Sequence, residues 1–189
     1  MNAYVRRFDR KESTEKKDQK ISAYFPPPMT KAFWKAVGDK GAIRDSDYVL
    51  GPIYSGGDMQ IGVTGGVAYH EAFDKAVSRE LGEEIGLVPK RKEDLNKLYK
   101  NRTGKKIMQV YDCFINDTTP VLDHQHSAKI TTEKDTPDLK VGCFVYGTKS
   151  TILKFLNQDK IYVYHSDDNI VGVGAIKVSD VWEALEKKK

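Results

Sequence analysis

The chain has 189 residues, of which 39% are hydrophobic and 31% are charged, and its formal net charge is +4. This length favours one domain with its own core, and it makes two domains or a fold stapled by disulfides poor explanations. No apolar run approaches the roughly 18 residues of a membrane span, and the N-terminus lacks the apolar core of a signal peptide. The small positive excess favours anionic ligands but does not by itself indicate nucleic-acid binding.

The cysteine pattern points to a compartment. Cys113 and Cys143 occur singly in strand-like segments, without a paired motif. Isolated cysteines of this kind are typical of buried free thiols in a reducing environment. We therefore expect a soluble, cytoplasmic protein with no membrane partner.

The first 20 residues are dominated by charge. The composition predicts a polar N-terminal arm over residues 1–20, followed by a single domain over residues 21–189. An arm that binds RNA is the less favoured alternative. Tyr4, Val5 and Phe8 leave open a third, in which this segment adds a strand to the sheet.

The next elements lead toward the centre of the chain. Ile21–Phe25 reads as a short strand, and Thr30 is predicted to cap a helix over Lys31–Val37. Two apolar runs, Asp47–Tyr54 and Met59–Val63, flank the turn sequence Ser-Gly-Gly-Asp and predict a hairpin.

Residues 65–87 read GGVAYHEAFDKAVSRELGEEIGL, which is a glycine pair followed by a predicted helix. Gly86 and the nearby Pro89 provide the stop signal. At about 100° per residue, Glu80, Glu83 and Glu84 share one face of this helix, the face that carries its apolar residues. We expect this face to point toward the body of the protein.

Three carboxylates on one face repel one another by roughly 0.2–0.5 kcal/mol a pair when exposed, and by more when partly desolvated. A solvated acidic surface is the plain alternative, but no lysine is interleaved among the three. We therefore expect a cation there. Carboxylate oxygens suit Mg²⁺ or Mn²⁺, and Arg79 lies beside the acids, where it can orient one of them through a bidentate hydrogen bond.

The remainder of the chain predicts further alternation of helices and strands. Lys90–Lys100 is predicted to be a charged helical connection, and residues 116–138 a long polar excursion of the kind that often carries substrate contacts. The other predicted elements are the strands Lys105–Phe114, Leu139–Tyr146, Lys160–Tyr164 and Ile170–Ile176, and the helices Thr148–Leu156 and one capped by Ser179. Strands around a central helix, with more helices beside them, predict an α/β fold with a mixed sheet between helices.

Nine residues of the stretch 65–87 fall on the spacing G-x5-E-x7-R-E-U-x-E-E-x-G-U, where U is a bulky aliphatic residue. This spacing resembles the Nudix box. The positions that match are Gly65, Glu71, Arg79, Glu80, Leu81, Glu83, Glu84, Gly86 and Leu87. The stretch from residue 65 to residue 87 makes up about an eighth of the chain.

The resemblance implies a Nudix-type α/β/α sandwich and a phosphoanhydride hydrolase. In such an enzyme, a water activated by Mg²⁺ or Mn²⁺ attacks a diphosphate linkage of a nucleoside diphosphate derivative in line. By resemblance, Glu80, Glu83 and Glu84 bind metal together with a backbone carbonyl of Gly65, for which Thr64 and Gly66 remain alternatives. Glu83, Glu84 and Arg79 are the catalytic residues implied, with Glu83 nearest the attacking water. The general base is a box glutamate or an acid of a distal loop, for which the candidates are Asp123, Glu133, Asp138, Asp167 and Asp168.

The substrate is less well defined by the sequence. Tyr24, Phe25, Phe33 and Trp34 are weak candidates for stacking on a nucleobase, with core packing as the alternative. The second functional hypothesis is a decapping enzyme, whose substrate would be a capped RNA 5′ end. A Nudix-fold module that binds nucleotide or RNA without turnover is the third, and the intact box acids argue against it.

Two competing motifs are weaker. The Gly-Thr-Lys-Ser run at residues 147–150 departs from a phosphate loop, because Thr148 separates the glycine from the lysine. His124 and His126 have no third ligand placed beside them for zinc.

Overall fold

The computed structural model describes residues 1–7, 19–37, 42–89, 91–116, 121–122, 134–158, 161 and 169–187. Within these ranges, no helix is long and apolar enough to cross a bilayer.

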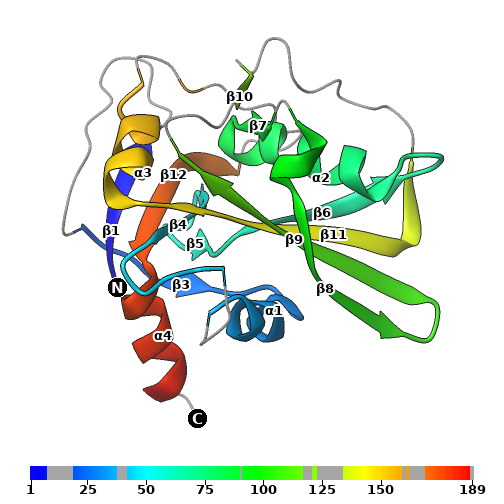
Figure 1. The fold of residues 1–189 in the computed structure, drawn as a ribbon, viewed down its shortest axis with the longest axis horizontal. Coiled ribbons are helices and arrows are strands. Elements are labelled where there is room, and N and C mark those ends of the chain that lie inside the picture. The colour runs from blue at the N-terminus through cyan, green and yellow to red at the C-terminus, as the bar shows by residue number, and fades with distance from the viewer. Residues whose placement is uncertain are drawn as a thin grey trace.

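A mixed sheet forms the centre of the molecule (Figure 1). Its main path runs in the order β2-β1-β12-β4-β11-β9-β8. These strands are β1 (Asn2–Arg7), β2 (Gln19–Lys20), β4 (Tyr48–Tyr54), β8 (Asn96–Thr103), β9 (Lys106–Ile115), β11 (Asp135–Gly147) and β12 (Ile170–Lys177). The β9–β11 pair is parallel and its neighbours on the path are antiparallel, so the sheet is mixed as predicted.

The sheet divides beside β11, and this division positions the glycine pair. The end of β11 pairs with β4, whereas its middle pairs with β6 (Val63–Ala68). β5 (Met59–Gln60) pairs with both β4 and β3 (Ala23–Tyr24), and so adds β3 to the β4 region. Among the described strands β6 pairs only with β11, so Gly65 and Gly66 lie on a strand whose other edge is not paired with a strand and can be approached by side chains.

Helices cover both faces of the sheet. In Figure 1, α2 (Phe73–Ile85) and α3 (Lys149–Leu156) lie above it, and α1 (Met29–Ala36) and α4 (Val178–Lys187) lie below it. Successive side chains of a strand point to opposite faces of the sheet, so the strands contribute to a hydrophobic core on each face. Val110 packs on the α1 side, and its neighbour Tyr111 packs on the α2 side. The predicted α/β sandwich is therefore confirmed at the level of its layers.

Several predicted elements are present. α2 ends at Gly86, whose φ of 72° is the left-handed cap expected of glycine. The hairpin between β4 and β5 turns at Gly57, whose φ of 93° is again one that glycine tolerates best. α3 is capped by Thr148, whose side chain accepts a hydrogen bond from the Thr151 N–H.

The helical connection predicted over Lys90–Lys100 is wrong. Of the described residues 91–100, only a short 3₁₀ turn, Lys92–Asp94, is helical, and β8 then forms a hairpin with β9 around Gly104. Leu98 and Tyr99 pack against the core, and this tertiary contact outweighs the helical propensity of the lysine, arginine and leucine residues in the segment. A two-stranded sheet of β7 (Val88–Pro89) and β10 (Val121–Leu122) also escaped prediction.

Element ends differ as well. Thr30 lies inside α1 and Ser179 inside α4, so neither is the cap that was predicted; α1 begins at Met29 without a side-chain cap hydrogen bond. β11 begins at Asp135, inside the predicted polar excursion, because its pairing with β9 and β6 fixes it as a strand. The predicted strand Lys160–Tyr164 lies outside the described residues, apart from Ile161.

The N-terminal segment is an added strand over the residues that the structure describes. β1 pairs with β12, and Tyr4 and Val5 are buried. Arg6 is buried too, and its guanidinium donates to the carbonyls of Leu156 and Gln158. The expected polar arm therefore does not begin at residue 1, and residues 8–18 lie outside the described part.

Candidate functional site

The turn between β6 and α2 brings the glycine pair against the box helix. Glu71, in this turn, accepts a hydrogen bond from the Ala68 N–H at 3.0 Å. His70 takes a φ of 62°, which lets the chain reverse within a few residues. The strand before the helix was predicted to end at Val63 and the glycine pair to form the turn, but Gly65 and Gly66 lie within β6 and the turn follows Ala68, because pairing with β11 extends the strand.

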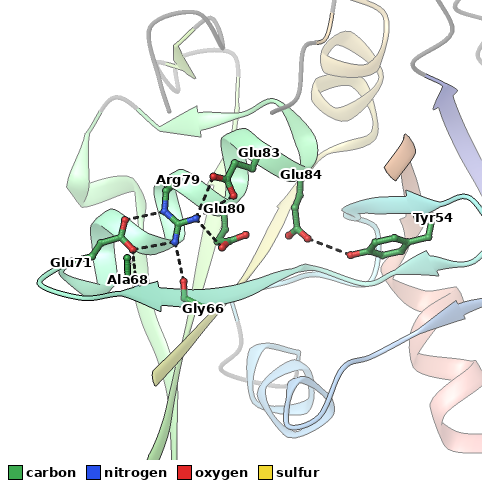
Figure 2. Close-up of polar contacts among 8 residues, drawn as sticks. All are labelled: Tyr54, Gly66, Ala68, Glu71, Arg79, Glu80, Glu83 and Glu84. Atoms are coloured by element: carbon green, nitrogen blue, oxygen red, sulfur yellow. Dashed lines mark hydrogen bonds and ion pairs between the residues drawn. The ribbon is translucent and has the colours of Figure 1, made fainter. Parts of the chain in front are cut away.

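Arg79 donates hydrogen bonds to most of the other polar groups of the site (Figure 2). Its Nε and Nη2 donate to the two carboxylate oxygens of Glu71 at 2.9 and 3.1 Å. Nη2 also donates to the Gly66 carbonyl at 3.0 Å, and Nη1 donates to Glu80 at 3.0 Å and to Glu83 at 3.2 Å. One guanidinium thus connects the turn, the glycine strand and the acidic helix face.

The energetics of this cluster follow from burial. Arg79 is only 8% exposed. Burial alone disfavours its charge, but the carboxylates of Glu71, Glu80 and Glu83 raise its pKa further above the usual range. Burial likewise raises the pKa of Glu71, yet the hydrogen bonds from Arg79 and Ala68 outweigh it and leave the pKa of Glu71 lowered.

The other acids are destabilised as anions. Burial, followed by the charge of Glu83, raises the pKa of Glu80 to about 7 despite the opposing effect of Arg79. Burial also raises the pKa of Glu83. The pKa of Glu84 is raised well above its usual range, chiefly by burial and then by the charge of Glu80. A cation additional to Arg79 would favour all three carboxylates.

Glu84 carries an orphaned atom. Its Oε1 accepts a hydrogen bond from the Tyr54 hydroxyl at 3.3 Å, and hydrogen bonding from Tyr54 and from the Thr64 backbone opposes the rise in its pKa, but its Oε2 is buried without a partner. In Figure 2 its side chain extends from α2 toward Tyr54 on β4, across the division of the sheet. A buried carboxylate oxygen without a donor is costly, so a cation bound beside this atom would stabilise the site.

The glycine pair has a steric reason. A Cβ placed on Gly65 would overlap the carboxyl group of Glu80, so this carboxyl rests directly on the strand backbone. A Cβ placed on Gly66 would lie 2.5 Å from Oδ2 of Asp135. Glycine at both positions lets two acids approach the same short stretch of β6.

Asp135 is a site residue that sequence reasoning missed. It lies at the start of β11, in register with Ala68 of β6. Its charge raises the pKa of both Glu80 and Glu83, although it is a smaller cause than burial in each case. The predicted loop over residues 116–138 hid it, because only strand pairing brings it opposite the box.

The donor chemistry fits a hard divalent ion. All the candidate ligands are oxygens, and Glu84 Oε2 lacks a partner. As the side chains stand, however, no three acidic, histidine or cysteine groups within the described ranges are gathered into a ligand set. Nη1 of Arg79 occupies the point toward which Glu80 and Glu83 turn, while Glu84 turns toward Tyr54.

The predicted aromatic candidates separate into two groups. Phe33 is fully buried against Phe25 and Phe144, as the core-packing alternative requires. Tyr24 is 42% exposed, and its pKa is raised by burial and then by the charges of Asp58 and Glu84. Trp34 contacts Trp182 of α4 with ring centroids 3.9 Å apart. Of the four, Tyr24 is therefore the one that the structure brings near the acids.

A pocket of about 410 Å³ lies between the β8–β9 hairpin, the start of β11 and the segment before α1. Asp138, one of the predicted general bases, lines it, together with Lys106 and Lys140. Its volume falls in the range of small-molecule sites. The other predicted bases, and the two histidines considered for zinc, lie outside the described residues: Asp123, Glu133, Asp167, Asp168, His124 and His126.

Searches against protein families, curated proteins and solved structures found no match for this chain. The functional assignment therefore depends on the box residues and on the geometry around them.

Proposed function

We propose that the chain is a metal-dependent hydrolase that cleaves a diphosphate linkage in a nucleoside diphosphate derivative. The observation that carries the proposal is the arrangement of Glu80, Glu83 and Glu84 on the inward face of α2, with Glu80 resting on Gly65 and Glu84 partly unpartnered. A solvated acidic face would show none of these features.

The chain's own residues have distinct tasks in this proposal. Arg79 orients Glu80 and Glu83 and ties them to the glycine strand. Glu71 holds Arg79 in place from the other side. Glu80, Glu83, Glu84 and a carbonyl of the Gly65 region would hold Mg²⁺ or Mn²⁺, which when bound neutralises diphosphate oxygens and lowers the pKa of water.

The bonds change in a simple order. An oxygen of water bonds to one phosphorus, the bond from that phosphorus to the bridging oxygen breaks, and the bridging oxygen leaves on the other phosphate. Glu83 is the acid that we assign to take the proton from water. It is 17% exposed at the side chain, so water reaches it while burial keeps its carboxylate basic.

The test is a substrate panel with purified protein and Mg²⁺ or Mn²⁺, including nucleoside diphosphate derivatives, free nucleotides and capped RNA. Glu83→Gln should lower turnover about 100-fold or more while the fold is retained. Glu183→Gln, which alters an exposed acid of α4, is the matched control and should leave turnover unchanged. Wild-type protein that binds a nucleotide without any turnover would instead identify a binding module.

The two cysteines are the buried free thiols that the sequence predicts. Cys113 and Cys143 are both buried free thiols, and burial raises the pKa of each. Neither thiol lies in the acidic cluster, so neither takes part in the proposed reaction.

A further inference from the structure

The β8–β9 hairpin is strongly basic. Between Asp94 and Asp112 the sequence contains no acidic residue, but it contains five cationic ones, all exposed: Lys97, Lys100, Arg102, Lys105 and Lys106. None of the five is ion-paired to a carboxylate among the described residues. Unpaired cations so close in sequence repel one another, so they favour an anionic ligand.

These cations lie on both faces of the hairpin. Residues directly opposite each other in an antiparallel pair share a face. The Thr103–Lys106 and Asn101–Met108 pairs line the pocket, whereas Lys100 and Arg102 alternate with Asn101 and Thr103 along β8 and so project from its other face. Ile107, the partner of Arg102, reaches the rim of the pocket as well. Because β8 ends the sheet, a ligand can contact both faces by passing over this edge.

The hairpin leads to the acidic site. Lys106 lines the pocket together with Lys140 of β11. Lys140 is the register partner of Gly66, whose carbonyl accepts from Arg79. Lys140 therefore brings positive charge beside the glycine pair on the face away from α2, and Lys97, opposite Tyr111, lies on the face that α2 covers.

The extent of this surface bears on the size of the ligand. β8 has 8 residues, which at about 3.3 Å per residue span roughly 26 Å. A diphosphate group is much shorter, so a free nucleotide engages only the part of this charge nearest the pocket. A polyanion with regularly repeated phosphates engages all of it.

We infer that the β8–β9 hairpin and Lys140 form a track for single-stranded RNA whose 5′-terminal phosphoanhydride reaches the acidic site. The inference rests on the proposed function, because the linkage to be cleaved selects the polymer. An RNA 5′ end carries a phosphoanhydride in its triphosphate or cap, whereas the interior of any nucleic acid contains only phosphodiesters. The track holds the phosphodiesters downstream of the linkage.

Binding and turnover are measured separately. Binding uses fluorescence anisotropy with 3′-labelled, 5′-triphosphorylated RNA of increasing length, in chelator, over a series of salt concentrations. The triple variant Lys97→Gln, Lys100→Gln and Arg102→Gln removes three track charges at exposed positions. The control Lys154→Gln, Lys177→Gln and Lys187→Gln removes the same charge from exposed positions at the other end of the sheet and on α3 and α4.

Wild-type affinity should rise with RNA length. The track variant should bind at least about tenfold more weakly at low salt, and its logarithmic salt slope should be shallower by roughly 2, because each phosphate contact contributes about 0.7. The control should match the wild type. Equal slopes for the two triple variants, or an affinity independent of RNA length, would overturn the track.

The two hypotheses fail differently. Metal-dependent turnover of small nucleotides without length-dependent RNA binding removes only the RNA track. Length-dependent RNA binding that needs the hairpin, without turnover of any diphosphate linkage, supports the track and removes the hydrolase.

Discussion

Arg79 binds Glu71 through two nitrogens, with Nε 2.9 Å from one carboxylate oxygen and Nη2 3.1 Å from the other. The planar guanidinium matches the carboxylate, and its remaining N–H groups point to the Gly66 carbonyl and to Glu80 and Glu83. A single side chain therefore sets the position of the helix face relative to the glycine strand.

Arg79→Lys should destabilise the protein and disable the site. A lysine keeps the charge but cannot donate to Glu71, Gly66 and the helix acids at once, so buried acceptors lose their donors. We expect a loss of about 1–3 kcal/mol in the free energy of unfolding. Urea denaturation measures the first effect, and turnover of the best substrate in the panel measures the second.

Arg91→Lys is the matched control. Arg91 also donates through two nitrogens to one carboxylate, that of Asp94, but its side chain is 56% exposed. Solvent replaces what the substitution removes, so the unfolding midpoint should stay close to that of the wild type. If both variants lose the same stability, the Arg79 network is no more than an ordinary surface contact.

Gly65→Ala should separate activity from stability. The added methyl group would overlap the Glu80 carboxyl, which sits at the end of a flexible side chain and can move away. The fold should survive while Glu80 is displaced, and turnover should fall at least about tenfold. Gly56→Ala, in the hairpin turn where a Cβ meets no atom within 4 Å, should leave both unchanged. Wild-type turnover in Gly65→Ala would show that the position of Glu80 against β6 is irrelevant.

The parts of the site that depend on residues close together in the sequence were predictable. Helical spacing alone places Glu80, Glu83 and Glu84 on one face, and the glycine stop at Gly86 follows from its φ preference. The bidentate role of Arg79 was also anticipated, although its bidentate partner is Glu71 and not one of the three helix acids.

The parts that escaped prediction depend on pairing between distant segments. Asp135 reaches the box only because β11 pairs with β6, and the sequence around it has the composition of a loop. The basic stretch in β8 was assigned to a helix, since charge carries little information about strand or helix until Leu98 and Tyr99 find the core. Arg6 was assigned to a polar arm, yet it is buried by contacts with the end of α3.

Asp135→Asn should weaken metal binding more than Asp138→Asn. Asp135 lies against Gly66 and raises the pKa of Glu80 and Glu83 through its charge, whereas Asp138 lines the neighbouring pocket. A carboxylate close to the acidic cluster should increase its attraction for a divalent ion. Titration with Mn²⁺ followed by electron paramagnetic resonance measures the affinity without turnover. Equal affinities for the two variants would place Asp135 outside the metal site.

The last prediction concerns pH and Mg²⁺. The pKa of Glu80 is about 7 in the folded chain, above the ordinary value of 4.5. Such a group stabilises the fold fully below its unfolded pKa, and this stability is lost as the pH rises from about 4.5 through about 7, because the unfolded chain releases the proton more readily. The pKa of Glu84 is raised in the same direction, whereas the lowered pKa of Glu71 affects stability only in more acidic solution.

Without divalent ions, the melting temperature of the wild type should therefore fall between about pH 5.5 and about pH 8, relative to Glu80→Gln, in which this titration is absent. Mg²⁺ needs the ionised carboxylates, so it should raise the melting temperature more at the higher pH than at the lower. Thermal unfolding at the two pH values, with and without Mg²⁺, measures both effects. A Mg²⁺ stabilisation that is the same at both pH values, or that persists in Glu80→Gln, would show that the ion binds somewhere other than the box carboxylates.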